Sequence, residues 1–152
     1  MVVGMDAGAV ADRYLLATEE TRRLVDRLLQ HDIDDRVWTD QLGPAYRQSS
    51  VADLLAKSKQ AVSRDHRLLR LTMRSGAVGY PALQFDGRRV LPGIAEVVER
   101  LAPVVATNWT IASWLTSAQP SLGDATPIDL LRARRVEPVV AAAGRFAEAL
   151  AT

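Results

Sequence analysis

Cysteine is absent from the 152 residues of this chain. That absence excludes disulfides, thiol nucleophiles and thiolate metal sites, and it is compatible with a reducing compartment. Aromatic residues make up only 5% of the chain, so the core has to be built from the aliphatic part of a 48% hydrophobic composition. No apolar run approaches the roughly 20 residues of a membrane helix. The start of the chain also lacks the basic segment and long apolar stretch of a secretory signal. We therefore expect a cytoplasmic, mainly helical protein that does not enter a membrane.

Motifs for catalysis are missing as well. The sequence contains no glycine-rich phosphate loop and no serine in a nucleophile-elbow pattern. Its two histidines, His31 and His66, lie far apart in the chain, so they do not suggest a metal site. We predict a binding protein rather than an enzyme, with no catalytic residues, metal or cofactor. An enzyme with an unrecognised site stays open as a minor alternative.

The net charge of +1 hides an uneven distribution along the chain. Residues 1–46 carry a net charge of −4, residues 47–74 carry +5, and residues 75–152 are neutral. A local basic block is typical of a phosphate-binding face. A solvated helix face that binds nothing explains the same charges, and on charge alone the two interpretations are about equal.

Apolar spacing predicts helices before this block. Leucine and valine recur every three to four positions through residues 11–30, and residues 37–42 favour a short helix that stops at Gly43. We interpret this segment as scaffold or dimerisation helix, with Trp38 as a packing anchor.

The basic block itself has the pattern of two helices joined by a tight turn. Ser49 and Ser50 are candidate N-caps for the first helix, and Ser58 is the candidate for the second. Val62, His66 and Leu69 would share the buried face of a second helix that runs through them. The opposite face would carry Gln60, Ser63, Arg64 and Arg67. This order is that of a helix-turn-helix, whose second helix lies in the major groove of DNA.

The stretch "VADLLAKSKQAVSRDHRLL" resembles the helix-turn-helix of bacterial regulators, which reads roughly L-L-G-V-S-x-Q-A-V-S. It departs from that pattern at Ala56, where glycine is usual, and at Lys57, where an apolar residue is usual. The resemblance implies that the DNA-facing residues are Lys59, Gln60, Ser63, Arg64 and Arg67. Glutamine and arginine read base edges, whereas lysine and serine more often hold phosphates.

A β-like stretch follows the basic block. The turn signals Ser75-Gly76 and Asp86-Gly87 separate residues 69–73, 78–85 and 88–91, which are expected to form a hairpin or a three-stranded ribbon. Pro81 should confine its strand to an edge position or break the pairing. The ribbon resembles the wing of winged-helix proteins, which would put Arg74, Arg88 and Arg89 near the DNA backbone. A plain connector between domains is an almost equal alternative.

The last third of the sequence again predicts helices. Ile94, Val97, Val98 and Leu101 repeat at helical spacing, and Ile111, Trp114 and Leu115 share one side of the next helix. Thr126 followed by Pro127 marks the start of a short helix, and Pro138 can begin the last one. One face of that last helix would carry four apolar residues: Val139, Ala143, Phe146 and Leu150.

The segment "IASWLTSAQPSLGDATPIDLLRARRVEPVVAAAGRF" resembles the toxin-binding domain of Xre/MbcA/ParS-type antitoxins, with their W-[LF], L-x-G-x-[TR]-P and [IL]-x-L-L motifs. The resemblance implies binding to a RES-domain toxin that degrades NAD, and repression of the antitoxin's own operon through the helix-turn-helix. It would put five residues at or near the toxin: Trp114, Leu131, Arg145, Phe146 and Leu150. Packing in the protein's own core is the more common role for Trp114 and Leu131.

The sequence thus predicts a mainly α protein of two parts. Residues 1–88 would hold an N-terminal helix and a helix-turn-helix with a possible wing, and residues 89–152 a small helical toxin-binding domain. The expected partners are a RES-domain toxin, double-stranded operator DNA and a second copy of the chain, as a homodimer or a larger complex with the toxin. The alternative is a transcription regulator without a toxin, whose C-terminal domain dimerises or senses a ligand.

Overall fold

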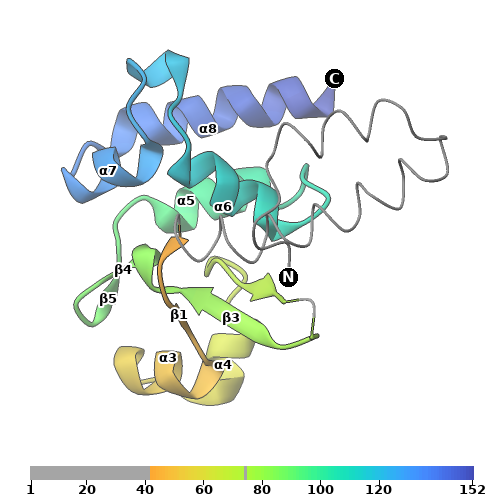
Figure 1. The fold of residues 1–152 in the computed structure, drawn as a ribbon, viewed down its shortest axis with the longest axis vertical. Helices are drawn as coiled ribbons and strands as arrows, with labels where there is room; N and C mark the ends of the chain where they lie inside the picture. The colour runs from red at the N-terminus through yellow and green to blue at the C-terminus, as the bar shows by residue number, and fades with distance from the viewer. Residues whose placement is uncertain (1–41, 74) are drawn as a thin grey trace, which may run out of the picture. The chain divides into compact units, whose positions relative to one another are not determined.

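The computed structural model describes residues 42–73 and 75–152, and in this part of the chain the fold is mainly α, as predicted. Residues 42–152 group into one unit (Figure 1). The elements run in this order: β1 (Ala45–Tyr46), α3 (Gln48–Leu55), α4 (Lys59–Arg64), β2 (Leu71–Thr72), β3 (Val78–Pro81), the 3-10 turn η1 (Ala82–Gln84), β4 (Phe85–Asp86), β5 (Arg89–Val90), α5 (Ile94–Leu101), α6 (Asn108–Thr116), the 3-10 turn η2 (Pro120–Leu122), α7 (Pro127–Arg132) and α8 (Val136–Ala151). The predictions for residues 1–41, Trp38 included, lie outside the described residues.

Helices α3 and α4 are joined by a tight turn, as the sequence predicts. Helix α3 ends at Leu55, and the next residue, Ala56, adopts the left-handed conformation with φ 54°. The Lys57 N–H donates to the Ala52 carbonyl at 2.9 Å and the Ala56 N–H to the Asp53 carbonyl at 3.3 Å, so a Schellman motif closes the helix. Ser58 then caps α4, because its hydroxyl accepts from the Ala61 N–H at 3.0 Å.

Helix α4 is shorter than predicted, because it ends at Arg64 rather than continuing through His66 and Leu69. The Asp65 carboxylate accepts from the Arg67 backbone N–H at 3.0 Å, which turns the chain out of the helix. His66 is therefore exposed in a turn, and the prediction that it lies on the buried helix face is wrong. Leu69 is fully buried, but in an extended segment after the helix.

Strand β3 is the central strand of a three-stranded antiparallel sheet with the order β1-β3-β2. Of the two alternatives for Pro81, the edge position is wrong, because β3 pairs with a strand on each side. Strand β3 ends at Pro81 itself, which is paired with Ala45 of β1. The Ala82 N–H donates to the Pro44 carbonyl at 2.9 Å, so the contact with the first strand continues past the missing N–H of proline. The predicted third strand pairs elsewhere: β5 forms a separate hairpin with β4.

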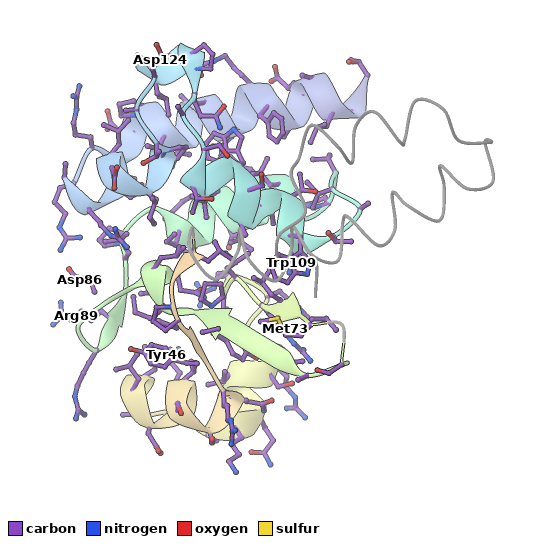
Figure 2. The ribbon with its side chains drawn as sticks, viewed as in Figure 1. Tyr46, Met73, Asp86, Arg89, Trp109 and Asp124 are labelled. Atoms are coloured by element: carbon purple, nitrogen blue, oxygen red, sulfur yellow. The ribbon has the colours of Figure 1, made fainter. Side chains whose placement is uncertain are left out.

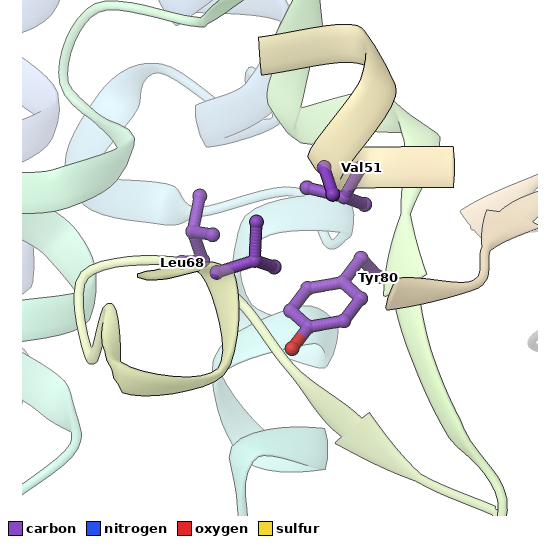
Figure 3. Close-up of a cluster of buried hydrophobic side chains, with 5 residues drawn as sticks. Val51, Leu68 and Tyr80 are labelled. Carbon is purple, nitrogen blue, oxygen red and sulfur yellow. The ribbon is translucent and has the colours of Figure 1, made fainter. Parts of the chain in front are cut away.

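The helix-turn-helix has its own buried cluster. Val51, Val62, Leu68 and Tyr80 pack together with Ala52, and Figure 3 shows the Tyr80 ring beside Val51 and Leu68. Phe85 and Val90 of the β4–β5 hairpin pack against this cluster. The hairpin is therefore attached directly to the helix-turn-helix.

The four C-terminal helices follow the predicted apolar pattern. The buried side of α5 is Ile94, Val97, Val98 and Leu101, and α6 buries Ile111, Ala112, Trp114 and Leu115. Thr126 caps α7 by accepting from the Asp129 N–H at 3.4 Å, with Pro127 as its first residue. Helix α8 begins at Val136, two residues before the predicted Pro138, which lies in the first turn, where its missing N–H has no helical partner to lose.

Side chains from the C-terminal helices reach the small sheet. The Asn108 amide donates to the Arg70 carbonyl at 2.9 Å, and the Trp109 indole N–H donates to the Thr72 carbonyl at 3.1 Å. Both acceptors lie at or beside β2, an edge strand of the sheet. Residue 88, where the sequence suggests a division, lies in the turn between β4 and β5. Across residues 42–73 and 75–152, no helix has the length and apolar character needed to cross a membrane.

Candidate functional site

The solvent-facing side of α4 carries most of the residues predicted to contact DNA. Lys59, Gln60 and Arg64 are exposed and Ser63 is half-buried, whereas Val62 is the buried residue of this helix. Positions four apart lie on the same helix face. Gln60 and Arg64 are therefore neighbours, and so are Lys59 and Ser63. The four polar side chains form one continuous surface.

A hydrogen bond from α3 holds the start of this helix. The Gln48 side-chain amide donates to the Lys59 carbonyl at 2.8 Å. Together with the Ser58 cap and the Schellman motif, it fixes α4 relative to α3 at the turn. The positions of Lys59 and Gln60 at the first turn of α4 are therefore set by three independent polar contacts.

The other predicted DNA contacts are less uniform. Arg67 lies beyond α4, and its Nε is 3.3 Å from the Asp65 carboxylate, so part of its guanidinium is already paired. Arg88 and Arg89 are exposed on the β4–β5 hairpin, and Figure 2 shows Arg89 at the outer edge of that hairpin. Arg74 lies outside the described residues.

The charge of this region remains basic in the structure. Between residues 42 and 73 the chain has six basic and two acidic side chains. All six basic residues are exposed: Arg47, Lys57, Lys59, Arg64, Arg67 and Arg70. An exposed basic surface attracts the phosphates of a nucleic acid over several ångströms, in a salt-dependent way.

The residues predicted at the toxin interface divide into two groups. Leu131 is fully buried and Trp114 is 5% exposed, so both belong to the core of the C-terminal helices. Arg145 is exposed, and Leu150 is 44% exposed on the last turn of α8. Phe146 is half-buried and stacks on Trp114, with ring centroids 6.1 Å apart and an interplanar angle of 17°. Phe146 thus connects the core to the exposed end of α8.

No group of three or more His, Asp or Glu side chains suited to a metal ion occurs among residues 42–73 and 75–152. Burial raises the pKa of Tyr80, against a smaller opposing effect of Arg70. The Tyr80 hydroxyl is buried and has no hydrogen-bond partner among the described residues. It lies within the cluster of buried side chains that packs against α3 and α4 (Figure 3).

Three residues that position this surface are absent from the sequence-based interpretation. Asp65 ends α4, Gln48 holds its start, and the buried Gln84 binds the chain after it. Gln84 accepts from the Leu69 N–H at 2.8 Å and donates to the Leu69 carbonyl at 2.8 Å and to the Pro81 carbonyl at 3.1 Å. The aspartate has a recognisable turn signal, since Asp side chains commonly bind the backbone two residues on. The two glutamines have no such signal.

Comparisons with known proteins support the fold. No family model matches the chain, and no curated protein matches it. Among solved structures, the chain is similar to one described as "NMR structure of Rv2175c", with a TM-score of 0.58 and 26% sequence identity. The similarity covers 68% of this chain and 81% of that one.

Proposed function

We propose that this protein binds double-stranded DNA through α4 and acts as an antitoxin that neutralises a RES-domain, NAD-degrading toxin. The observation that carries the DNA part is the exposed polar face of α4, which stands after a tight turn with only Val62 buried. A helix presented in this way fits the major groove. Gln60 and Arg64 would read base edges, and Lys59 and Ser63 would hold phosphates.

The toxin part rests on the sequence resemblance to Xre/MbcA/ParS-type antitoxins and on the end of α8. Leu150 is an exposed large hydrophobic residue, and it follows Phe146 by four positions, so both lie on one face. Arg145 is also exposed, but it lies about 100° around the helix axis from Phe146. Aromatic side chains and arginine are both enriched at protein interfaces.

The DNA proposal is tested by selecting binding sequences from a random duplex library with the full chain. The Q60A and R64A variants should each relax the sequence preference at a distinct position, with a loss of about 1–3 kcal/mol of discrimination per bidentate contact. R145A, at the end of α8, serves as the matched control and should leave the preference intact. Unchanged preference in both α4 variants would remove α4 from base reading.

The toxin proposal is tested by purifying the tagged chain from its native host and measuring NAD consumption by any protein that stays bound. We expect a stoichiometric partner that is silent in the complex and active when released. L150D should weaken that complex about tenfold or more, because it buries a charge in an apolar contact. E137Q, at the other end of α8, is the control. Equal inhibition by L150D and the unchanged chain would exclude this end of α8.

A plain transcription regulator is the second candidate. The burial of Trp114 and Leu131 favours it, because the two most distinctive residues of the resemblance serve the core. In that case the chain would be recovered alone or with DNA only. DNA binding does not separate the two candidates, since both expect an affinity that falls steeply with salt.

A further inference from the structure

We propose that a second DNA-backbone contact is made by five arginines of the β4–β5 hairpin and the turn between α7 and α8. They are Arg88, Arg89, Arg132, Arg134 and Arg135, here named the arginine ridge. The proposal rests on DNA binding by α4 and extends the DNA contact into the C-terminal helices. In sequence the two halves of the ridge lie more than 40 residues apart.

Two contacts bring the halves together. The Arg134 guanidinium forms an ion pair with the Asp86 carboxylate of β4. Gly93, three residues after β5, lies against Leu131 and Val136: a Cβ built on it would be 2.5 Å from the Leu131 Cδ2 and 3.1 Å from the Val136 Cγ1. Figure 1 shows the hairpin and α7 on the same side of the fold, and Figure 2 shows Asp86 and Arg89 at the outer edge of the hairpin.

The charges of the ridge are not balanced by its own acids. All five arginines are exposed. Arg134 pairs with Asp86, and the Arg132 Nη1 lies 3.9 Å from the Asp129 Oδ1. Glu137 is the third acid in these two segments, so they keep an excess of two positive charges. Arg88, Arg89 and Arg135 form no ion pair or hydrogen bond through their side chains with any residue in the described part of the chain.

The backbone at Arg134 is a second, independent observation. Arg134 has φ 63° and occupies the left-handed position of a Schellman motif at the end of α7. Its N–H donates to the Leu131 carbonyl at 3.0 Å, and the Arg135 N–H donates to the Leu130 carbonyl at 2.8 Å. Glycine is the residue that adopts this position without strain. An arginine here keeps a strained backbone in exchange for a side chain that reaches Asp86 and extends the basic surface.

Attachment to the helix-turn-helix favours DNA over other acidic partners. Phe85 and Val90 of the hairpin pack against the buried cluster beneath α3 and α4, and the Phe85 ring lies 5.9 Å from that of Tyr46 in β1. The hairpin half of the ridge is thus joined to α3 and α4 through one buried cluster. A duplex held by α4 would bring its phosphates toward the parts of the protein beside that helix, the hairpin among them. Arginine binds phosphate oxygens in a bidentate geometry.

The test is the salt dependence of binding of the full chain to a 30-base-pair duplex of fixed sequence. Each phosphate contact contributes about −0.9 to the slope of log affinity against log salt concentration. The double variants R88Q/R89Q and R132Q/R135Q should each make the slope shallower by about 1–2 and lower the affinity about 10- to 100-fold at low salt. R100Q removes an exposed arginine outside the ridge and should change neither quantity.

The outcomes separate this inference from the proposed function. Unchanged slopes in both ridge variants, with a weakened R64A variant, would overturn the ridge and leave α4 in place. No duplex binding by the unchanged chain would overturn both. If the ridge variants lose an acidic protein partner while the salt slope of their duplex binding stays unchanged, the proposed role of the ridge would also be overturned. R134G provides a further readout: the urea midpoint should stay near that of the unchanged chain while the slope becomes shallower by about 1.

Discussion

The helix-turn-helix and the four C-terminal helices are stabilised in different ways. Around α3 and α4 the turns depend on polar side chains bound to backbone: Ser58, Gln48, Asp65 and Gln84. The helices α5 to α8 depend on aliphatic side chains at helical spacing, several of them fully buried. Helix length does not explain the difference, because α4 and α7 each have six residues, and α4 buries one side chain whereas α7 buries three. What distinguishes α4 is that its polar side chains outnumber its apolar ones, and three of the four, Lys59, Gln60 and Arg64, are exposed.

The largest effect on stability should come from a substitution in the aliphatic core of helices α5 to α8. Replacing Leu131 by alanine removes a fully buried side chain and should lower the free energy of unfolding by about 2–5 kcal/mol. Urea denaturation measures it. L130A, at a half-buried neighbouring position, is the control and should cost less. A loss of partner binding by L131A with unchanged stability would mean that Leu131 acts as a contact rather than in the core.

In the region around α3 and α4, the loss of Gln84 should have the largest effect on stability. A leucine there leaves the Leu69 N–H and two buried carbonyl groups without their partner, at a cost of about 2–3 kcal/mol. The same denaturation experiment applies. Q119L is a control at a partly buried glutamine that also bonds to backbone carbonyls, but in the C-terminal part. If Q84L lowers the free energy of unfolding no more than a surface substitution does, the three hydrogen bonds of the Gln84 side chain are not what stabilises this region.

The Ser58 cap should have a smaller effect on stability and a visible one on DNA. S58A removes the bond to the Ala61 N–H and should cost about 1 kcal/mol. Because the cap fixes the first turn of α4, duplex affinity should fall as well. S58D supplies another good capping group and should restore the stability. An S58A variant as stable as the unchanged chain would contradict the role of the cap.

Tyr80 should give the smallest change at neutral pH, and its effect should grow in alkali. The raised pKa in the folded protein means that the stability it contributes is fully present below the unfolded value near 10.0 and is lost as pH rises through the folded value. Y80F removes a buried hydroxyl that has no hydrogen-bond partner among the described residues, so it should be neutral or slightly stabilising. Unfolding curves from pH 7 to 11 should fall less steeply for Y80F. Parallel curves would count against this assignment.

The sequence predicts most of the C-terminal half and less of the first half. The buried positions of α5 and α6 and the Thr126 cap follow from local spacing, which is why they were predictable. The end of α4 was not, because one Asp65 side chain outweighs an apolar pattern that continues to Leu69. The central position of β3 depends on its pairing with β1, a strand of only two residues that precedes α3. Such long-range pairing has no local signal.

The candidate site was predictable to a similar degree. The polar face of α4 follows from the same local pattern as the helix itself, and Lys59, Gln60, Ser63 and Arg64 share it. The nearness of Arg134 to Asp86 spans 48 residues and depends on how α7 packs beside the hairpin. Periodicity cannot reveal a contact of this kind.

Helix α8 also bears on how many partners can be bound at once. At about 1.5 Å per residue, the eleven residues from Arg135 to Phe146 separate the two positions by about 16 Å along the axis. One end of this rod belongs to the arginine ridge, and the other carries Leu150. On the proposals made above, a duplex and a protein partner occupy opposite ends and do not compete for the same atoms. The expected assembly is therefore a ternary complex, in which the protein partner and the duplex are held together by a single helix.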